Sequence, residues 1–160
     1  MKRRLNVIAA PGQLRRSTAL ADIERTELAT LNPHEEQFAR AFVVPEKRAR
    51  YLSLLESQRG RKKLLNALNH CHDLDPRFAT LIPANEQSEQ SIENVLRQKG
   101  APDKCHVMSD NPDIDNREMA LTDALSKTVA MDAGTLISCI PGKLAYFEME
   151  GFDGRYVLER

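Results

Sequence analysis

The chain has 160 residues, of which 41% are hydrophobic and 29% are charged. This composition is typical of a globular domain and excludes a disordered chain. A chain of this length can bury roughly two-thirds of its unfolded surface in one core, so we expect a single α+β domain. No run of about 18 apolar residues occurs, which excludes a transmembrane helix. The apolar stretch at residues 7–10 is too short for the core of a signal peptide.

The three cysteines, Cys71, Cys105 and Cys139, are an odd number in a chain without a secretory signal. Such a pattern argues against a disulfide framework. We therefore expect reduced thiols and a cytoplasmic protein that is not bound to a membrane.

The formal net charge is zero, but the charges are divided unevenly along the chain. Residues 1–63 contain 14 basic and 7 acidic residues, whereas residues 64–160 contain 9 basic and 16 acidic residues. Two faces of one fold, or two halves that attract each other, would explain this division. The functional alternative is a basic surface for an anionic partner beside an acidic surface for another partner.

Residues 1–16 contain five basic residues and no acidic one, and we expect them to form a mobile basic tail. The single domain then occupies residues 17–160. Within it we expect a helical part at 17–72, an ordered connection at 73–87, and a C-terminal part at 88–160.

The helical part is predicted to contain several short amphipathic helices. Ser17 precedes an apolar periodicity that indicates a first helix over 18–31. Asn32 and Pro33 are a capping residue and a preferred first helical residue, so a second helix should begin there. Pro45 can begin a third helix, which Gly60 is expected to bend or end.

The C-terminal part is predicted to start with a helix that Ser88 or Ser91 caps and that stops near Gly100. Strands are expected at 105–108, 135–140, 144–149 and 155–158, with a helix over 119–131 between the first two. The predicted fold class is therefore α+β. Short amphipathic helices of the N-terminal half would pack on one face of a small, mainly antiparallel sheet of about four strands.

Basic residues are concentrated in residues 46–63, and we select five of them as candidate anion-binding or nucleic-acid-binding residues. If residues 59–70 form one helix, several of these cations lie opposite a stripe of leucines, a geometry that suits phosphate contacts. A solvated basic face is the alternative, because no aromatic residue is interleaved for stacking on bases. The five candidates are Arg48, Arg59, Arg61, Lys62 and Lys63.

The densest group of chemically versatile side chains is the segment from His70 to Asp75. His70 and His72 could act as a base, and Asp73 or Asp75 could orient it. On a helix, residues two apart point in different directions and cannot hold one metal ion, so we predict no metal site and favour polar helix capping.

Two further features offer alternatives that we consider weaker. Ser138 or Cys139 could be a nucleophile, but the two side chains point to opposite faces of a strand, and a strand cysteine is usually a core thiol. Residues 110–116 alternate oxygen donors as a calcium loop does. They lack the glycine and glutamate that such a loop requires, and we expect a polar turn.

The function predicted from the sequence is a non-catalytic interaction or regulatory module with segregated basic and acidic surfaces. Its partner would be a protein, a nucleic acid or a second copy of the chain. We predict no catalytic residue, metal or cofactor for it. The alternative is a small hydrolase or nuclease that uses the segment from His70 to Asp75.

Overall fold

The structure is a computed structural model that describes residues 31–151 and 154–160. The expected basic tail and the helix expected over 18–31 lie outside these residues. The helices are α2 (Pro33–Phe42), α3 (Pro45–Leu55), α4 (Gln58–Leu68), the 3-10 helix η1 (Ala84–Glu86), α5 (Glu89–Gln98) and α6 (Leu121–Ser126). The strands are β1 (Ala79–Leu81), β2 (Lys104–Ser109), β3 (Arg117–Ala120), β4 (Thr135–Ile140), β5 (Leu144–Glu148) and β6 (Arg155–Glu159).

The strands form one sheet in the order β1-β6-β5-β4-β2-β3. Every pairing between these strands is antiparallel. The register places Val107, Ile137, Tyr146 and Val157 in one row across four strands. Because successive side chains of a strand point to opposite faces, this row and the row beside it contribute to different cores.

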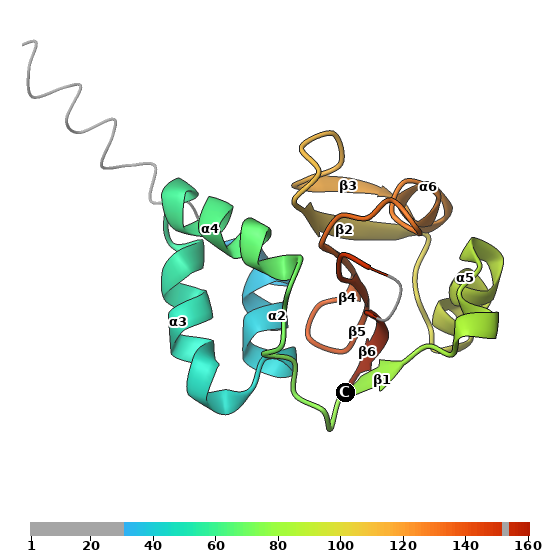
Figure 1. Cartoon of the computed structure of the whole chain (residues 1–160), viewed down its shortest axis with the longest axis horizontal. Coiled ribbons are helices and arrows are strands. Elements are labelled where there is room, and N and C mark those ends of the chain that lie inside the picture. Colours follow the sequence, from blue (N-terminus) through green and yellow to red (C-terminus); the bar gives the residue numbers. More distant parts are fainter. Residues whose placement is uncertain (1–30, 152–153) are drawn as a thin grey trace, which may run out of the picture. The chain divides into compact units, whose positions relative to one another are not determined.

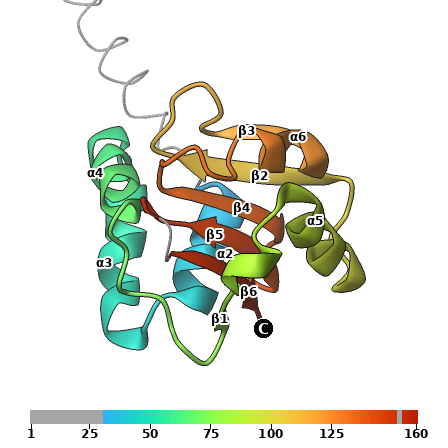
Figure 2. The ribbon, with the colours of Figure 1, turned by 45° about the vertical axis from the view of Figure 1, so that its right-hand side comes forward.

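Helices cover both faces of the sheet, and each face has its own hydrophobic core. Figure 1 shows α2, α3 and α4 on one side of the strands and α5 and α6 on the other, and the rotated view agrees (Figure 2). Leu136 and Phe147 pack with Phe38 on the first side. Ile137 and Tyr146 pack with Ile92 on the second side. The segment Leu31–Arg160 thus forms one compact unit.

The predicted α+β class is confirmed, as is the packing of the N-terminal helices on one face of an antiparallel sheet. Within the described residues the sheet has six strands rather than about four. The two additional strands, β1 and β3, are short, and most of their residues are exposed, so they lack an apolar alternation. The second face is covered by α5 and α6, which the expectation of helices on one face did not include. None of the helices in the described ranges is long and apolar enough to cross a bilayer.

The helix starts follow the capping residues of the sequence. The side chain of Asn32 accepts a hydrogen bond from the backbone of His34, and the side chain of Ser88 accepts one from the backbone of Ser91. Ser57 caps α4 in the same way. Residues Glu56 and Ser57, and not Gly60, therefore separate α3 from α4.

Gly60 lies in the first turn of α4, where the chain leaves no room for a side chain. A Cβ atom at this position would lie 2.3 Å from the backbone oxygen of Leu54. The expectation that Gly60 bends or ends a helix is wrong, because its role is to let α3 and α4 approach each other closely.

Candidate functional site

The basic surface of α4 is formed by Arg59, Lys62 and Lys63, which we call the α4 basic face. All three residues are exposed. The opposite side of the helix carries Leu64, Leu65 and Leu68, which are buried in the core. Within residues 31–151 and 154–160, the three cations of the α4 basic face form no ion pair. They are therefore available to an anionic partner.

The other two candidate cations make contacts within the fold. Arg48 donates a hydrogen bond from Nε to the backbone oxygen of Val43, at 2.9 Å, and lies 3.8 Å from a carboxylate oxygen of Asp75. Arg61 forms ion pairs with Glu35 and Asp115. The structure thus brings three of the five predicted residues together on one surface and directs Arg61 toward the sheet.

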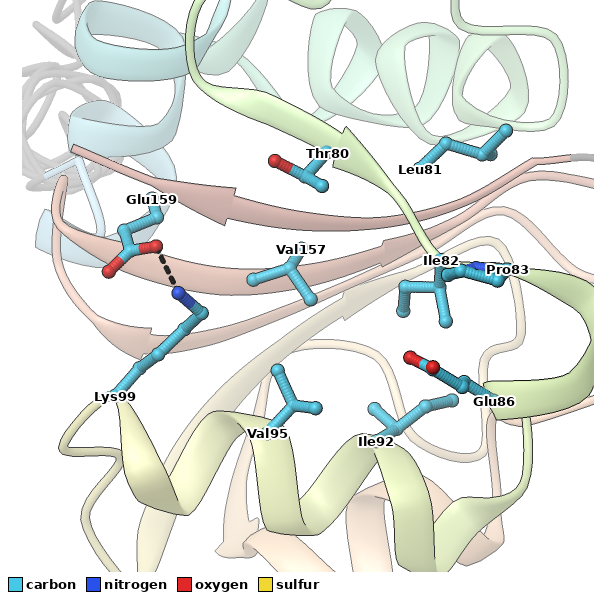
Figure 3. Close-up of a pocket in the computed structure, with 10 residues that line it drawn as sticks. All are labelled: Thr80, Leu81, Ile82, Pro83, Glu86, Ile92, Val95, Lys99, Val157 and Glu159. Atoms are coloured by element: carbon cyan, nitrogen blue, oxygen red, sulfur yellow. Dashed lines mark hydrogen bonds and ion pairs between the residues drawn. The ribbon is translucent and has the colours of Figure 1, made fainter.

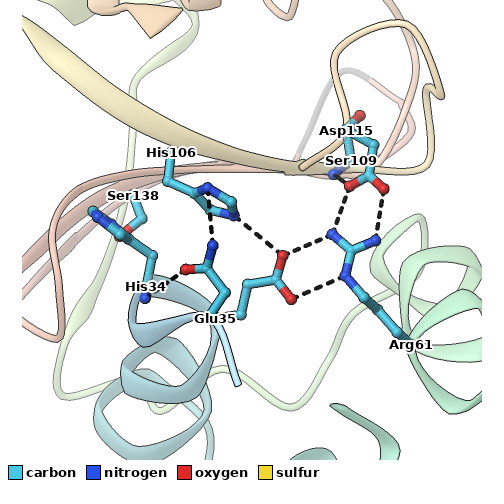
Figure 4. Close-up of polar contacts among 8 residues, drawn as sticks. His34, Glu35, Arg61, His106, Ser109, Asp115 and Ser138 are labelled. Carbon is cyan, nitrogen blue, oxygen red and sulfur yellow. Dashed lines mark hydrogen bonds and ion pairs between the residues drawn. The ribbon is translucent and has the colours of Figure 1, made fainter. Parts of the chain in front are cut away.

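Arg61 is the centre of a buried polar network that joins α2, α4, β2 and the loop after β2 (Figure 4). Its guanidinium donates two hydrogen bonds to Glu35, at 3.0 and 2.7 Å. Two more reach Asp115, at 2.6 and 2.8 Å. Glu35 is only 3% exposed, so Arg61 supplies the charge that lets this carboxylate remain ionised inside the protein.

His106 completes the network from the opposite side of Glu35. Its Nε2 lies 3.1 Å from Oε1 of Glu35, and its Nδ1 lies 3.4 Å from Nδ2 of Asn32. With a proton on Nε2, the imidazole donates a hydrogen bond to the carboxylate. Burial alone would raise the pKa of Glu35, but the hydrogen bonds from His106 and Arg61 outweigh burial and lower it.

His34 stacks on His106, with ring centroids 5.3 Å apart, and its Nδ1 lies 2.9 Å from Oγ of Ser138. Burial, and then repulsion by His106, lower the pKa of His34. In a serine nucleophile activated by a histidine base, the two side chains are hydrogen-bonded as they are here. Ser138, however, is only 2% exposed, which leaves its hydroxyl without room for a substrate, so the contact serves to hold α2 against β4.

The segment from His70 to Asp75 does not converge on one site. His70 and His72 are exposed, and His70 lies 3.6 Å from a carboxylate oxygen of Glu150. Asp73 accepts a hydrogen bond from the hydroxyl of Tyr51, at 3.0 Å. Asp75 is bound by the guanidinium of Arg77, whose hydrogen bonds lower the pKa of the carboxyl to about 2. The side chains of His70, Asp73 and Asp75 therefore make separate contacts with different partners.

Neither Cys139 nor a metal-binding group forms a reactive site in the described residues. Cys139 is buried in the core beneath α5 and α6, on the face opposite Ser138. Burial raises the pKa of Cys139 to about 12. The part of the chain that the structure describes contains no group of three or more histidine, cysteine or acidic residues positioned to hold a metal ion.

A groove of about 550 Å³ lies beside the α4 basic face, between α4 and the loop that follows β2. Lys62 and Asn66 of α4 line one wall, and Asp110 and Asn116 of the loop line the other. The amide of Asn69 donates a hydrogen bond to Asp110, at 3.0 Å. Lys62 thus belongs both to the α4 basic face and to the groove, whose facing wall carries the carboxylate of Asp110 beside the amide of Asn116.

Sequence reasoning did not identify His34, Glu35 and His106 as parts of one network. The sequence shows Glu35 as an acid in the first turn of a helix, where a negative charge interacts favourably with the helix dipole. The only local signal is an acid on the buried side of an amphipathic helix, adjacent to Asn32 and Pro33 in the sequence. The partners come from segments 26 and 71 residues away, and a single sequence does not reveal such pairings.

Comparisons with known proteins provide no relative for this chain. It matches no protein-family model, no curated protein and no solved structure. Its function is therefore argued from the geometry alone.

Proposed function

We propose that the chain is a non-catalytic binding module that holds an anionic partner, foremost a nucleic acid, on the α4 basic face. The observation that carries the proposal is the exposure of Arg59, Lys62 and Lys63 on one side of a helix, without an ion pair within the described residues. Such a row can contact successive phosphates, and the release of counterions drives the binding.

Beside the α4 basic face, the carboxylates of Asp110 and Asp115 repel phosphates, so the phosphate contacts fall to the cations of that face. The groove beside Lys62 offers the amides of Asn66 and Asn116, which can hydrogen-bond to sugars and bases. No tryptophan occurs in the chain, so we expect the binding to depend on phosphate contacts more than on base stacking. We therefore expect weak sequence preference.

The test is fluorescence anisotropy of a labelled single-stranded RNA with the full chain, at about 50 mM salt and then at rising salt. The triple variant Arg59→Gln, Lys62→Gln and Lys63→Gln should weaken binding. It should also flatten the slope of log K against log salt by about 2, since each lost phosphate contact removes about 0.7.

A matched control removes three exposed cations elsewhere, with the same change in net charge. Arg117, Lys127 and Lys143 are exposed, and changing all three to Gln should leave affinity and salt slope nearly unchanged. If both triple variants weaken binding equally, only net charge matters and the α4 basic face is not the site. If the unchanged chain does not bind at about 50 mM salt, the nucleic-acid proposal is refuted. Salt-dependent self-association, measured by sedimentation equilibrium, would then identify an acidic protein surface as the partner.

The alternative of a hydrolase or nuclease at the segment from His70 to Asp75 requires a base and an orienting acid in contact. The two acids of the segment are engaged by Tyr51 and Arg77, and within the described residues neither forms a hydrogen bond or ion pair with His70 or His72. This arrangement gives the enzyme proposal less support than the binding module. The variant His72→Gln should leave nucleic-acid binding unchanged, and a loss of phosphodiesterase activity in that variant would restore the enzyme proposal.

A further inference from the structure

A second cavity, unrelated to the α4 basic face, lies where α5 faces β1 and β6 (Figure 3). We call it the α5 pocket, and its volume is about 130 Å³. Its wall is formed mainly by branched aliphatic side chains from three separate segments, and these are Ile82, Ile92, Val95 and Val157.

The size and lining of the α5 pocket suit a small hydrophobic group. Ile82, Ile92 and Val157 are buried, so they provide a wall that does not need to move when the pocket is filled. An apolar cavity of about 150 Å³ lined by similar side chains is sufficient to bind benzene. The α5 pocket can therefore take one aromatic ring or a short branched alkyl chain.

The charged groups at the rim define the other end of the ligand. Lys99 and Glu159 form an ion pair with each other, so their charges are already compensated. Glu86 of η1 has no such partner: its carboxylate makes no ion pair and no hydrogen bond within residues 31–151 and 154–160. Figure 3 shows this carboxylate pointing into the pocket, between Ile82 and Ile92.

An unpaired carboxylate beside an apolar cavity is complementary to a ligand that combines a cation with a hydrophobic group. A cation could form a charge-assisted hydrogen bond with Glu86, whereas a carboxylate would be repelled by it. Glu86 is exposed, and solvent screening limits the gain from such a pair. The hydrophobic contact would supply affinity, and Glu86 would supply the preference for a positive charge.

We propose that the α5 pocket binds a small primary amine whose hydrophobic part is about the size of a benzene ring. The ring lies between Ile92 and Val157, and the ammonium donates hydrogen bonds to Glu86. This site is separate from the α4 basic face in position and in charge, so its test is independent of the function proposed above.

The test is a titration of the full chain with three probes, followed by the amide and methyl NMR signals of the pocket residues. The probes are 2-phenylethylamine, the neutral 2-phenylethanol and the anionic phenylacetate. The amine should bind about three to ten times more tightly than the alcohol, from one charge-assisted contact at a partly exposed site. Phenylacetate should bind most weakly.

Two variants separate the contributions of charge and cavity. Glu86→Gln should abolish the preference for the amine over the alcohol while leaving the affinity for the alcohol unchanged. Val95→Phe should fill the pocket and weaken all three probes at least about tenfold. Glu89→Gln is the matched control, because it removes an exposed acid of α5 that does not line the pocket, and it should preserve the preference.

Three results would overturn the proposal. The first is that the NMR signals of the pocket residues do not shift when the amine is added up to about 10 mM, a concentration at which even millimolar binding is detectable. The second is that phenylacetate binds as tightly as the amine. The third is a preference for the amine that survives in Glu86→Gln.

Discussion

Replacing Arg61 with glutamine tests whether the buried polar network holds α2 and α4 against the sheet. The change removes a positive charge that donates two hydrogen bonds to Glu35 and two to Asp115. Glu35 is almost completely buried, and of its partners among the described residues it would keep only His106. The folded state would then contain an under-compensated carboxylate, which is far costlier than the loss of an exposed ion pair.

The expected loss of stability is about 3 kcal/mol, the lower end of the range for breaking one side of a buried ion pair. The lower end applies because the side chain of Arg61 is 21% exposed, so water can partly replace it. For a protein of this size, about 1 kcal/mol shifts the melting temperature by roughly 2–4 °C. Arg61→Gln should therefore melt about 6–12 °C lower than the unchanged chain.

The measurement is urea unfolding followed by circular dichroism, with the free energy of unfolding extrapolated to water. Arg50→Gln is the control, because Arg50 is an exposed cation of the neighbouring helix α3 and forms no ion pair within the described residues. It should change stability by less than about 0.5 kcal/mol.

The double variant Glu35→Gln and Arg61→Gln separates the pair from its surroundings. Because the buried charge is removed together with its partner, the double variant should be more stable than the sum of the single losses predicts, by about 1–3 kcal/mol. A loss below about 1 kcal/mol for Arg61→Gln, or additive single losses, would refute the claim that this pair anchors the helices.

Three other predictions concern local features of the fold. Gly60→Ala should destabilise the protein by about 1–3 kcal/mol, because the new Cβ would clash with the backbone of Leu54. This clash outweighs the gain in helix propensity of about 1 kcal/mol. A variant that is more stable in urea unfolding would contradict this. Burial, and then the stacked imidazole, lower the pKa of His34 below its unfolded value near 6.5. The unfolded chain therefore binds the proton first, the free energy of unfolding should fall as the pH drops from about 7.5 to 5.5, and His34→Gln should flatten that dependence. Burial raises the pKa of Cys105 and Cys139 to about 12, so both thiols should react with a disulfide reagent at about pH 8 only after unfolding in urea, and rapid labelling of the native chain would contradict their burial.

The local signals of the sequence predict most of the elements correctly. Asn32 with Pro33, and Ser88, lie where α2 and α5 begin, because an N-cap side chain satisfies backbone groups that the helix itself leaves free. The strands β2, β4, β5 and β6 are marked by apolar residues and by the turns between them. Three residues of the predicted basic cluster also lie on the solvent face of α4, since helical periodicity separates them from the leucines.

The signals that fail are those in which the decisive partner is distant in sequence. The strands β1 and β3 are recognisable only from the neighbours that they pair with, because their own residues are mostly exposed. The local sequence does not show that Arg61 differs from Lys62 in exposure. The side chain of Arg61 nevertheless binds Glu35 and Asp115, which lie 26 and 54 residues away.

The sequence by itself thus determines where α2, α3 and α5 begin, which faces of the helices are apolar, and that the α4 basic face is exposed. These properties depend on residues within about one helical turn of each other. Only the tertiary structure decides that Arg61 belongs to a buried network, that His34 lies against Ser138, and that the α5 pocket has at its rim a carboxylate without a partner among the described residues. Each of these depends on how chain segments far apart in sequence pack on the two faces of the sheet, and burial there determines which charges need a partner.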